Sequence, residues 1–232
     1  MNLFYQPRIP EGIFYLDTDE SRHCVKVLRK KTGDHIRITD GKGFFYEAVI
    51  LKTDDRQCSF EVEQKTEAPA RRHAIHMAIS PTKNPDRIEW FVEKAVEFGV
   101  EKISLMECEH TERTYLKTER LEKVAVSAMK QSLKASLPVI GDISTFSTIV
   151  DSSQESGKFI AYVDETNPHH LKDVAIPERS YLILIGPEGD FTPEELGHAL
   201  RHGFQKVSLG KSRLRTETAG LAACHILNLI NS

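Results

Sequence analysis

The sequence lacks the features that define several specialised classes of protein. None of its apolar runs approaches the ~18–20 residues that a membrane span requires, and residues 1–12 lack the basic and apolar pattern of a signal peptide. The four cysteines lie far apart and form no CxxC pair, which predicts reduced thiols and no disulfide framework. A chain of 232 residues with 28% charged residues is typical of a globular protein, which we expect in the cytoplasm.

The sequence also has no net excess of basic residues, since its formal charge is −3. Lys and Arg are nevertheless concentrated in two segments, 22–31 and 201–216, each with five of them and no acidic residue. A solvated surface explains such a segment, but local basic patches also bind a phosphate backbone whatever the total charge. The charge pattern therefore leaves nucleic-acid binding open.

Motifs for several other chemistries are absent as well. The sequence has no GxGxxG dinucleotide loop, no acidic-Gly-x-Gly loop of a Rossmann-type methyltransferase, no GxxxxGK[ST] loop and no GxSxG elbow. Its ten histidines include no HExxH pattern, and His169-His170 is interpreted as part of an exposed polar loop. We therefore expect no bound metal and no membrane partner.

The first 70 residues predict a small β domain with one helix. Strands are expected in three segments rich in β-branched and aromatic residues: 35–40, 44–51 and 60–64. Residues 40–43, Asp-Gly-Lys-Gly, predict a hairpin turn. Residues 18–31 predict an amphipathic helix. Its basic side chains have the spacing of a single helix face: Arg22, Lys26, Arg29 and Lys30. This arrangement favours a small β-barrel.

After a linker at 68–72, residues 71–232 alternate between strand and helix patterns. The expected strands are 73–80, 102–108, 158–165, 181–187 and 206–210. The expected helices are 86–100 with Gly99 as its stop, 118–135, one that starts with Thr192 as its cap, and 216–230. This alternation is typical of an α/β domain with a mainly parallel sheet.

Two of the strand ends carry unusual motifs. One runs directly into Gly186-Pro187-Glu188-Gly189, and the other ends in Leu209-Gly210 before a basic loop and a helix that begins near Thr216. Ligands bind at the carboxyl ends of strands in open α/β sheets, and glycine and a helix start both offer backbone groups to them. Each motif taken alone also fits an ordinary strand-to-helix turn or a helix cap.

Taken together, IGPEG.FT..E (185–195) and LG..RLRTETA (209–219) resemble the SPOUT class of RNA methyltransferases. More narrowly, the chain resembles the RsmE family of 16S rRNA (uridine-N3)-methyltransferases. The likeness extends to three further segments: 23–29, 86–100 and 130–138. Asp190 stands where glycine is frequent in the family, and Lys130 and Lys134 stand where Glu and Arg are frequent.

The resemblance implies a PUA-like, RNA-binding β-barrel at 1–70 and, at 71–232, an α/β domain with a deep trefoil knot. It further implies a homodimer that methylates N3 of a specific uridine of 16S rRNA, in the small ribosomal subunit. S-adenosyl-L-methionine is the implied cofactor. The implied cofactor-binding residues are Gly186, Pro187, Glu188, Gly189, Leu209, Gly210, Leu214, Arg215, Thr216 and Thr218.

Methylation of uridine N3 requires removal of its proton. We expect Arg215 to stabilise the resulting negative charge, with Glu188, Glu217 or water as the general base. The expected RNA-binding residues are Arg8, Arg22, Lys26, Arg29, Lys30 and Gln131. Two alternatives remain: a SPOUT methyltransferase that acts on a guanine nitrogen or a ribose 2′-hydroxyl, and a non-catalytic ribosomal RNA-binding protein.

Overall fold

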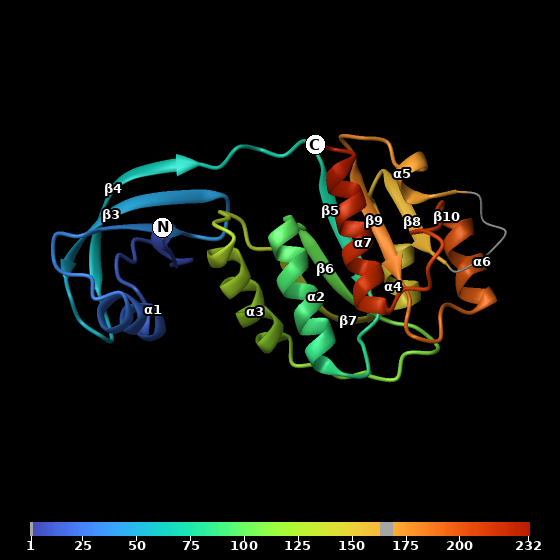
Figure 1. Ribbon diagram of the computed structural model, residues 1–232, viewed down its shortest axis with the longest axis horizontal. Helices are drawn as coiled ribbons and strands as arrows, with labels where there is room; N and C mark the ends of the chain where they lie inside the picture. The colour runs from blue at the N-terminus through green and yellow to red at the C-terminus, as the bar shows by residue number, and fades with distance from the viewer. Residues whose placement is uncertain (1, 163–168) are drawn as a thin grey trace. The chain divides into compact units, whose positions relative to one another are not determined.

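The computed structural model describes residues 2–162 and 169–232 (Figure 1). The chain forms two compact units. The first unit comprises Met1–Ala70 and Val126–Leu137, and the second unit comprises Arg71–Ala125 and Pro138–Ser232. Residues 126–137, which the sequence analysis grouped with the second domain, join the first unit through hydrogen bonds. The carbonyl of Ala135 accepts hydrogen bonds from the hydroxyl of Thr39 and from the amide of Gly43, each at 3.0 Å.

The first unit contains a four-stranded sheet in the order β1-β2-β3-β4. Its strands are β1 (Leu3–Tyr5), β2 (His35–Thr39), β3 (Phe44–Lys52) and β4 (Ser59–Glu67). β1 is parallel to β2, and the other neighbours are antiparallel. The predicted turn at 40–43 is confirmed, because Asp40 Oδ1 accepts from the backbone of Lys42 and Phe44 while Tyr46 donates its hydroxyl to Asp40 Oδ2. The unit has its own apolar core, which includes Phe4, Leu16, Ile38, Ile50 and Phe60.

The helix predicted over 18–31 is confirmed only over residues 18–27, and it is not a regular α-helix. After a 3₁₀ turn η1 (Ile9–Glu11), the chain forms a short helix α1 (Thr18–Arg22) and then a π-helical turn η2 (His23–Val27). The amide of Leu28 donates to the carbonyl of His23, five residues earlier, and Arg29 has a φ of 55° that ends the helix. Because Arg29 and Lys30 lie beyond the last helical residue, Val27, the four basic residues Arg22, Lys26, Arg29 and Lys30 do not share one helix face.

The second unit contains a parallel sheet in the order β10-β8-β9-β5-β6-β7, so the predicted α/β class is confirmed (Figure 1). The strands are β5 (Ala74–Ile79), β6 (Lys102–Glu107), β7 (Val139–Thr145), β8 (Gly157–Ala161), β9 (Ser180–Ile185) and β10 (Gln205–Val207). The helices of this unit are α2 (Pro85–Phe98), α4 (Phe146–Asp151), α5 (Leu171–Val174), α6 (Pro193–Arg201) and α7 (Thr216–Leu229). Helix α3 (Thr118–Gln131) begins in the second unit, and its residues from Val126 on belong to the first. Strand β7 and helices α4 and α5 were not predicted from the sequence. The end of the strand predicted at 158–165 lies outside the described residues.

Helices cover both faces of this sheet. Successive side chains of a strand point to opposite faces, and Ile79 of β5 lies beside Phe91 of α2 and Gly220 of α7. The preceding residue, Ala78, belongs to a buried cluster with residues of α4 and α6, among them Phe146 and Ala199. The pairs α2–α7 and α4–α6 therefore pack on opposite faces.

Helix boundaries follow local capping signals. Asn84 accepts from the amide of Asp86 at the start of α2, and Gly99 ends that helix with a φ of 79°. The predicted capping box of α6 is confirmed between Thr192 and Glu195. Helix α3 ends earlier than predicted, before Leu133, whose φ of 54° is incompatible with a continuing helix.

None of the described helices is both long and apolar enough to cross a membrane. All four cysteines are free and buried. Burial raises the pKa of the Cys108 and Cys224 thiols above the usual value, which disfavours the reactive thiolate.

Candidate active site

The two motifs at the strand ends meet at the carboxyl edge of the parallel sheet. Thr216, the first residue of α7, donates its hydroxyl to the carbonyl of Gly186 at 3.0 Å. The end of β5 is joined to the same edge, because the amide of Ser80 donates to the carbonyl of Ile185 at 3.0 Å. We define the strand-end site as loop 186–191, loop 208–215 and the first turn of α7.

Loop 186–191 is closely packed, which explains its two glycines. A Cβ on Gly186 would lie 3.0 Å from the ring of Phe191, and a Cβ on Gly189 would lie 3.0 Å from Cβ of His110. His110 also donates from Nδ1 to the carbonyl of Asp190 at 3.0 Å. Asp190 has a φ of 62°, the left-handed conformation that glycine adopts most easily and that Asp tolerates. This left-handed conformation explains why glycine is frequent at this position in the family.

Loop 208–215 is more open. Gly210 has a φ of 129°, and apart from its chain neighbours no heavy atom of the described residues lies within 4 Å of a Cβ placed on it. Arg215 is the N-cap of α7, but its exposed side chain makes no capping hydrogen bond. The first amides of α7 are therefore not capped by that side chain and face the strand-end site as hydrogen-bond donors with the positive end of the helix dipole.

A buried carboxylate lies beside these loops. The side chain of Glu217 is 10% exposed, and its Oε1 is 3.9 Å from Nε of Arg87. Its Oε2 is buried and has no hydrogen-bond partner in the described part of the chain. A pocket of about 270 Å³ adjoins it, lined by Asp86, Arg87, Trp90, Glu217 and Thr218. Because a buried polar atom without a partner is costly, this carboxylate points to a polar ligand in the pocket.

The structure brings together part of the expected site. Gly186, Thr216 and Thr218 lie at the strand-end site, and Glu217 lines the pocket. Glu188 and Arg215 are exposed and do not line it. The remaining expected cofactor residues lie on the same two loops: Pro187, Gly189, Leu209, Gly210 and Leu214.

Four residues of this region were not predicted to belong to a site. Asp86, Arg87 and Trp90 reach the pocket because α2 packs against α7, which the sequence does not reveal. His110 follows the carboxyl end of β6. Since ligands bind at the carboxyl ends of strands in such sheets, this position was the signal that could have identified it.

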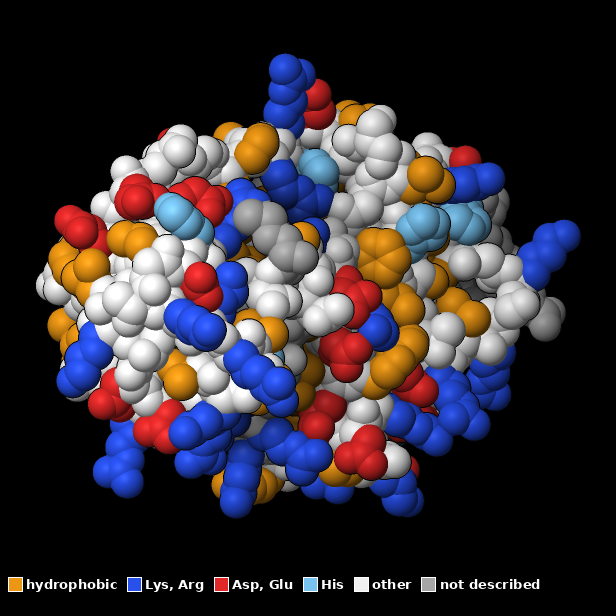
Figure 2. Space-filling view, turned by 60° about the vertical axis from the view of Figure 1, so that its left-hand side comes forward, with side chains coloured by type: hydrophobic (Ala, Val, Ile, Leu, Met, Phe, Trp, Pro, Cys, Tyr) orange, Lys and Arg blue, Asp and Glu red, His pale blue; other side chains and the backbone are white. Residues whose placement is uncertain are grey.

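The expected RNA-binding residues all belong to the first unit. Arg8, Arg22 and Arg29 are exposed and form no ion pair with described residues, whereas Lys26 lies 3.4 Å from Asp55. Lys30 donates to the carbonyl of His35, and Gln131 is exposed at the end of α3. Figure 2 shows Lys and Arg side chains in large number along the lower edge of one face of the molecule.

Lys130 differs from the Glu frequent in the family for a local reason. Its ammonium pairs with the carboxylate of Glu20, and both side chains are largely buried. Glu20 in turn accepts from the amide of Tyr5 at 3.1 Å. This ion pair fixes the segment 126–137 to the start of the first unit.

Family models match both parts of the chain. The model of an RNA methyltransferase domain matches residues 69–228, and the model of an RNA methyltransferase PUA domain matches residues 16–63. The first of these matches covers more than half of the chain. The resemblance stated from the motifs is therefore confirmed at the level of the family.

Solved structures and curated relatives are similar over the full chain. A crystal structure of a probable rRNA-methyltransferase from Porphyromonas gingivalis has 46% identity and a TM-score of 0.94, covering 100% of this chain and 98% of that one. A crystal structure of a ribosomal RNA small subunit methyltransferase E from Neisseria gonorrhoeae bound to S-adenosyl methionine has 28% identity and a TM-score of 0.86, with the same coverage. The ribosomal RNA small subunit methyltransferase E of Aquifex aeolicus is 27% identical over 231 residues, which are 98% of this chain and 99% of that protein.

Proposed function

The chain belongs to the RNA methyltransferase family, and we propose that it transfers a methyl group from S-adenosyl-L-methionine to N3 of a uridine in 16S rRNA, within the small ribosomal subunit. The observation that carries this proposal is the hydrogen bond between Thr216 and Gly186, which joins the two motif loops into one site. The related protein from N. gonorrhoeae is bound to S-adenosyl methionine, which supports the choice of cofactor.

The strand-end site suits this cofactor chemically. It offers the first amides of α7 and an open backbone at Gly210, and both can bind the polar groups of an amino acid and a nucleoside. The residues that we propose to hold the cofactor are Gly186, Pro187, Glu188, Gly189, Leu209, Gly210, Leu214, Arg215, Thr216 and Thr218. When bound, S-adenosyl-L-methionine supplies an electrophilic methyl group on a sulfonium.

The pocket beside Glu217 is the proposed place of the uracil ring. Trp90 is 42% exposed and gives an unpaired base an aromatic surface for stacking. Because N3 lies on the pairing edge, the uridine must be unpaired or flipped out to enter. We assign the removal of the N3 proton to Glu217, whose free Oε2 is an acceptor, in preference to the exposed Glu188.

The negative charge that develops on the uracil ring requires a cation close to it. Once N3 gives its proton to the carboxylate, negative charge is spread over N3, O2 and O4 until the new N–C bond forms. A guanidinium close to these oxygens stabilises that charge, and we assign this role to Arg215. Its exposed side chain does not line the pocket in this structure, so the role requires it to turn toward the base when RNA binds. The proton leaves Glu217 for solvent after the methylated base departs.

The rest of the chain supplies RNA binding and assembly in this proposal. The first unit binds the rRNA backbone through Arg8, Arg22, Lys26, Arg29, Lys30 and Gln131. We further propose a deep trefoil knot at the joined loops and a homodimer, which is supported by exposed apolar residues on α2 and α7, Trp90 and Leu229. The reduced cysteines fit a cytoplasmic location.

Nucleoside mass spectrometry of small-subunit rRNA from a deletion strain tests this function. N3-methyluridine is expected to be lost in the deletion strain and restored when the intact gene is returned. An unchanged amount of N3-methyluridine contradicts the proposal. Loss of a methylated guanine or a 2′-O-methylated ribose supports the related methyltransferase, and failure to bind S-adenosyl-L-methionine in calorimetry supports the non-catalytic RNA-binding protein.

A further inference from the structure

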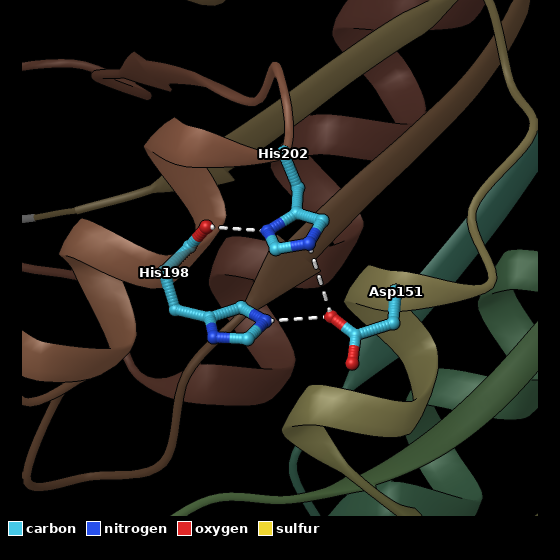
Figure 3. Close-up of side chains that lie close together, drawn as sticks. All are labelled: Asp151, His198 and His202. Carbon is cyan, nitrogen blue, oxygen red and sulfur yellow. Dashed lines mark hydrogen bonds and ion pairs between the residues drawn. The ribbon is translucent and has the colours of Figure 1, made fainter.

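Three side chains outside the two motifs point toward one another on the second unit (Figure 3). Asp151 is the last residue of α4, while His198 lies on α6 and His202 is its C-cap. Oδ1 of Asp151 is 2.6 Å from Nε2 of His198 and 3.3 Å from Nε2 of His202. One ligand atom from each residue lies within 4.8 Å of the other two.

The spacing of the two histidines places both on one side of the helix. Residues four apart on an α-helix are neighbours on its surface, and the rings of His198 and His202 stack with centroids 4.4 Å apart and an interplanar angle of 11°. Their Nε2 atoms therefore converge on the same carboxylate oxygen, as Figure 3 shows. The sequence was interpreted as containing no metal-binding histidine spacing, and this His-x₃-His pair departs from that expectation.

Hydrogen bonds determine which nitrogens carry protons. The carbonyl of His198 can only accept, so Nδ1 of His202, 3.0 Å away, carries a hydrogen and donates it. In neutral His202 the lone pair is then on Nε2 and faces Asp151 Oδ1. Histidines that bind metals typically donate their second ring N–H to a carbonyl or carboxylate in this way, which fixes the tautomer.

We propose that Asp151, His198 and His202 form a binding site for one zinc-like divalent transition-metal ion. Bonds of ~2.0–2.1 Å in a tetrahedral site separate two ligand atoms by roughly 3.3 Å, which is the observed distance between Asp151 Oδ1 and His202 Nε2. His198 Nε2 must withdraw from Asp151 Oδ1 by about 0.7 Å, from 2.6 Å to roughly 3.3 Å. His198 must also change from its Nε2–H to its Nδ1–H tautomer, which requires no net loss of a proton.

The donor set also selects the class of ion. Two imidazoles and one carboxylate favour zinc, copper, nickel or cobalt, whereas magnesium and calcium prefer oxygen ligands alone. The side chains of Asp151 and His202 are 54% and 40% exposed, so water completes the coordination. The ammonium of Lys158 is 3.5 Å from the carbonyl of His202 and also donates to the carbonyl of Ser153. It approaches the backbone and not the ligand atoms.

Such an ion joins the ends of two helices that otherwise meet through apolar contacts. Helix α6 begins at the capping box that follows loop 186–191, and its other end carries the ligands. The ion therefore restrains the element that leaves the strand-end site, while it uses none of the residues of that site. We assign it a structural role.

Titration of the EDTA-treated full chain with ZnCl₂ in a calorimeter tests the proposal. One equivalent is expected to bind in a manner that depends on the three residues, and His198→Gln, His202→Gln or Asp151→Asn is expected to weaken it by about tenfold or more. The matched control is His35→Gln, because His35 lies 3.2 Å from a single carboxylate, Glu63, in the first unit. It is expected to leave zinc affinity unchanged.

Equal zinc affinity of the wild type and the His198→Gln/His202→Gln double variant would overturn the proposal. Binding of MgCl₂ to the wild type with the same affinity as ZnCl₂ would overturn it as well. Circular dichroism in EDTA verifies that the variants fold. Nitrogen NMR of the wild-type imidazoles provides a test without substitution. Zinc is expected to shift the Nε2 signals of His198 and His202, and unchanged signals at saturating ZnCl₂ contradict the site.

Discussion

Glu217 is the single residue on which the proposed chemistry depends most. The sequence predicted three acid–base candidates at equal standing, and burial distinguishes them. A carboxylate in the first turn of a helix is ordinary as a capping feature, but a buried oxygen without a partner beside a pocket is not. The sequence shows residue types and spacing, and burial depends on packing between distant elements.

Replacing Glu217 by Gln is expected to slow methyl transfer by about 10²–10⁴-fold, because the amide cannot accept the N3 proton. The affinity for S-adenosyl-L-methionine is expected to change little. Single-turnover methylation of small-subunit rRNA and calorimetry measure the two quantities. Glu194→Gln, an exposed change in the first turn of α6, is the matched control. Full activity of Glu217→Gln would show that Glu217 is not the general base.

Tyr46 illustrates a structural role at the same scale. Its hydroxyl donates to Asp40 Oδ2 at 3.0 Å, and burial together with this hydrogen bond and the charge of Asp40 raises the pKa of Tyr46 to about 12. The raised pKa favours the neutral phenol in the fold. The stabilisation is therefore complete below the unfolded value of about 10 and is lost as the pH rises through about 12.

Tyr46→Phe is expected to lower the free energy of unfolding by about 1–2 kcal/mol at pH 7, because Asp40 loses a buried hydrogen-bond donor. The difference between the variant and the wild type is expected to shrink between about pH 10 and 12. Urea denaturation at several pH values measures it. A difference that grows with pH would contradict the assigned cause.

Helices and strands were predictable where their signals are local. The caps of α2 and α6 lie within a few residues of the helices they start, and the sequence shows them directly. Helix α4 has six residues and β7 is mostly half-exposed, so neither shows a clear hydrophobic period. The π-helical turn η2 ends at Leu28, and no capping residue in the sequence marks this end. Its position and its wider turn could therefore not be predicted.

The packing of α2 on α7 depends on one small residue. A Cβ on Gly220 would lie 2.6 Å from the ring of Phe91 and 3.0 Å from Ile79. Gly220→Ala is therefore expected to lower the free energy of unfolding by about 1–3 kcal/mol. Gly197→Ala in α6 is the matched control, since its Cβ meets only the mobile end of Arg201.

Gly197→Ala is expected to leave the free energy of unfolding unchanged or to raise it by up to about 1 kcal/mol, because alanine has a higher helix propensity than glycine. Thermal or urea unfolding measures both variants. If Gly220→Ala is as stable as Gly197→Ala, the close approach of the two helices is not the constraint described.

At the scale of the whole molecule, the net charge of −3 conceals an uneven distribution. Residues of the first unit carry 13 Lys and Arg against 12 Asp and Glu, a net +1, and the second unit carries 18 against 22, a net −4. Arg8, Arg22 and Arg29 are exposed and have no ion partner in the part of the chain that the structure describes, which makes the first unit the better match for a phosphate backbone.

Charge reversal of Arg22 and Lys26 to Glu is expected to weaken RNA binding and to lower its salt dependence by about one unit of slope per lost phosphate contact. Binding of S-adenosyl-L-methionine is expected to stay unchanged. Lys102→Glu, an exposed charge at the start of β6 in the second unit, is the matched control. Equal loss of RNA and cofactor binding would contradict separate roles for the two units.

The motifs predicted the two loops of the strand-end site but not the walls of its pocket. Asp86, Arg87 and Trp90 come from a helix more than 100 residues before Glu217 in the sequence, and only the packing of α2 on α7 brings them together. Local sequence encodes the loops, because glycine and proline constrain the backbone directly. It does not encode which helix covers which end of the sheet.

The most direct test of the proposed activity is transfer of a labelled methyl group. Purified protein is incubated with S-adenosyl-L-methionine that carries a trideuterated methyl group and with small ribosomal subunits that lack the modification. Nucleoside mass spectrometry of the digested 16S rRNA then identifies the product. Trideuterated N3-methyluridine is expected in the wild-type reaction, and its rate of formation is expected to be about 10²–10⁴-fold lower with Glu217→Gln. Label on a guanine or a ribose, or no label in the RNA, would contradict the proposed activity.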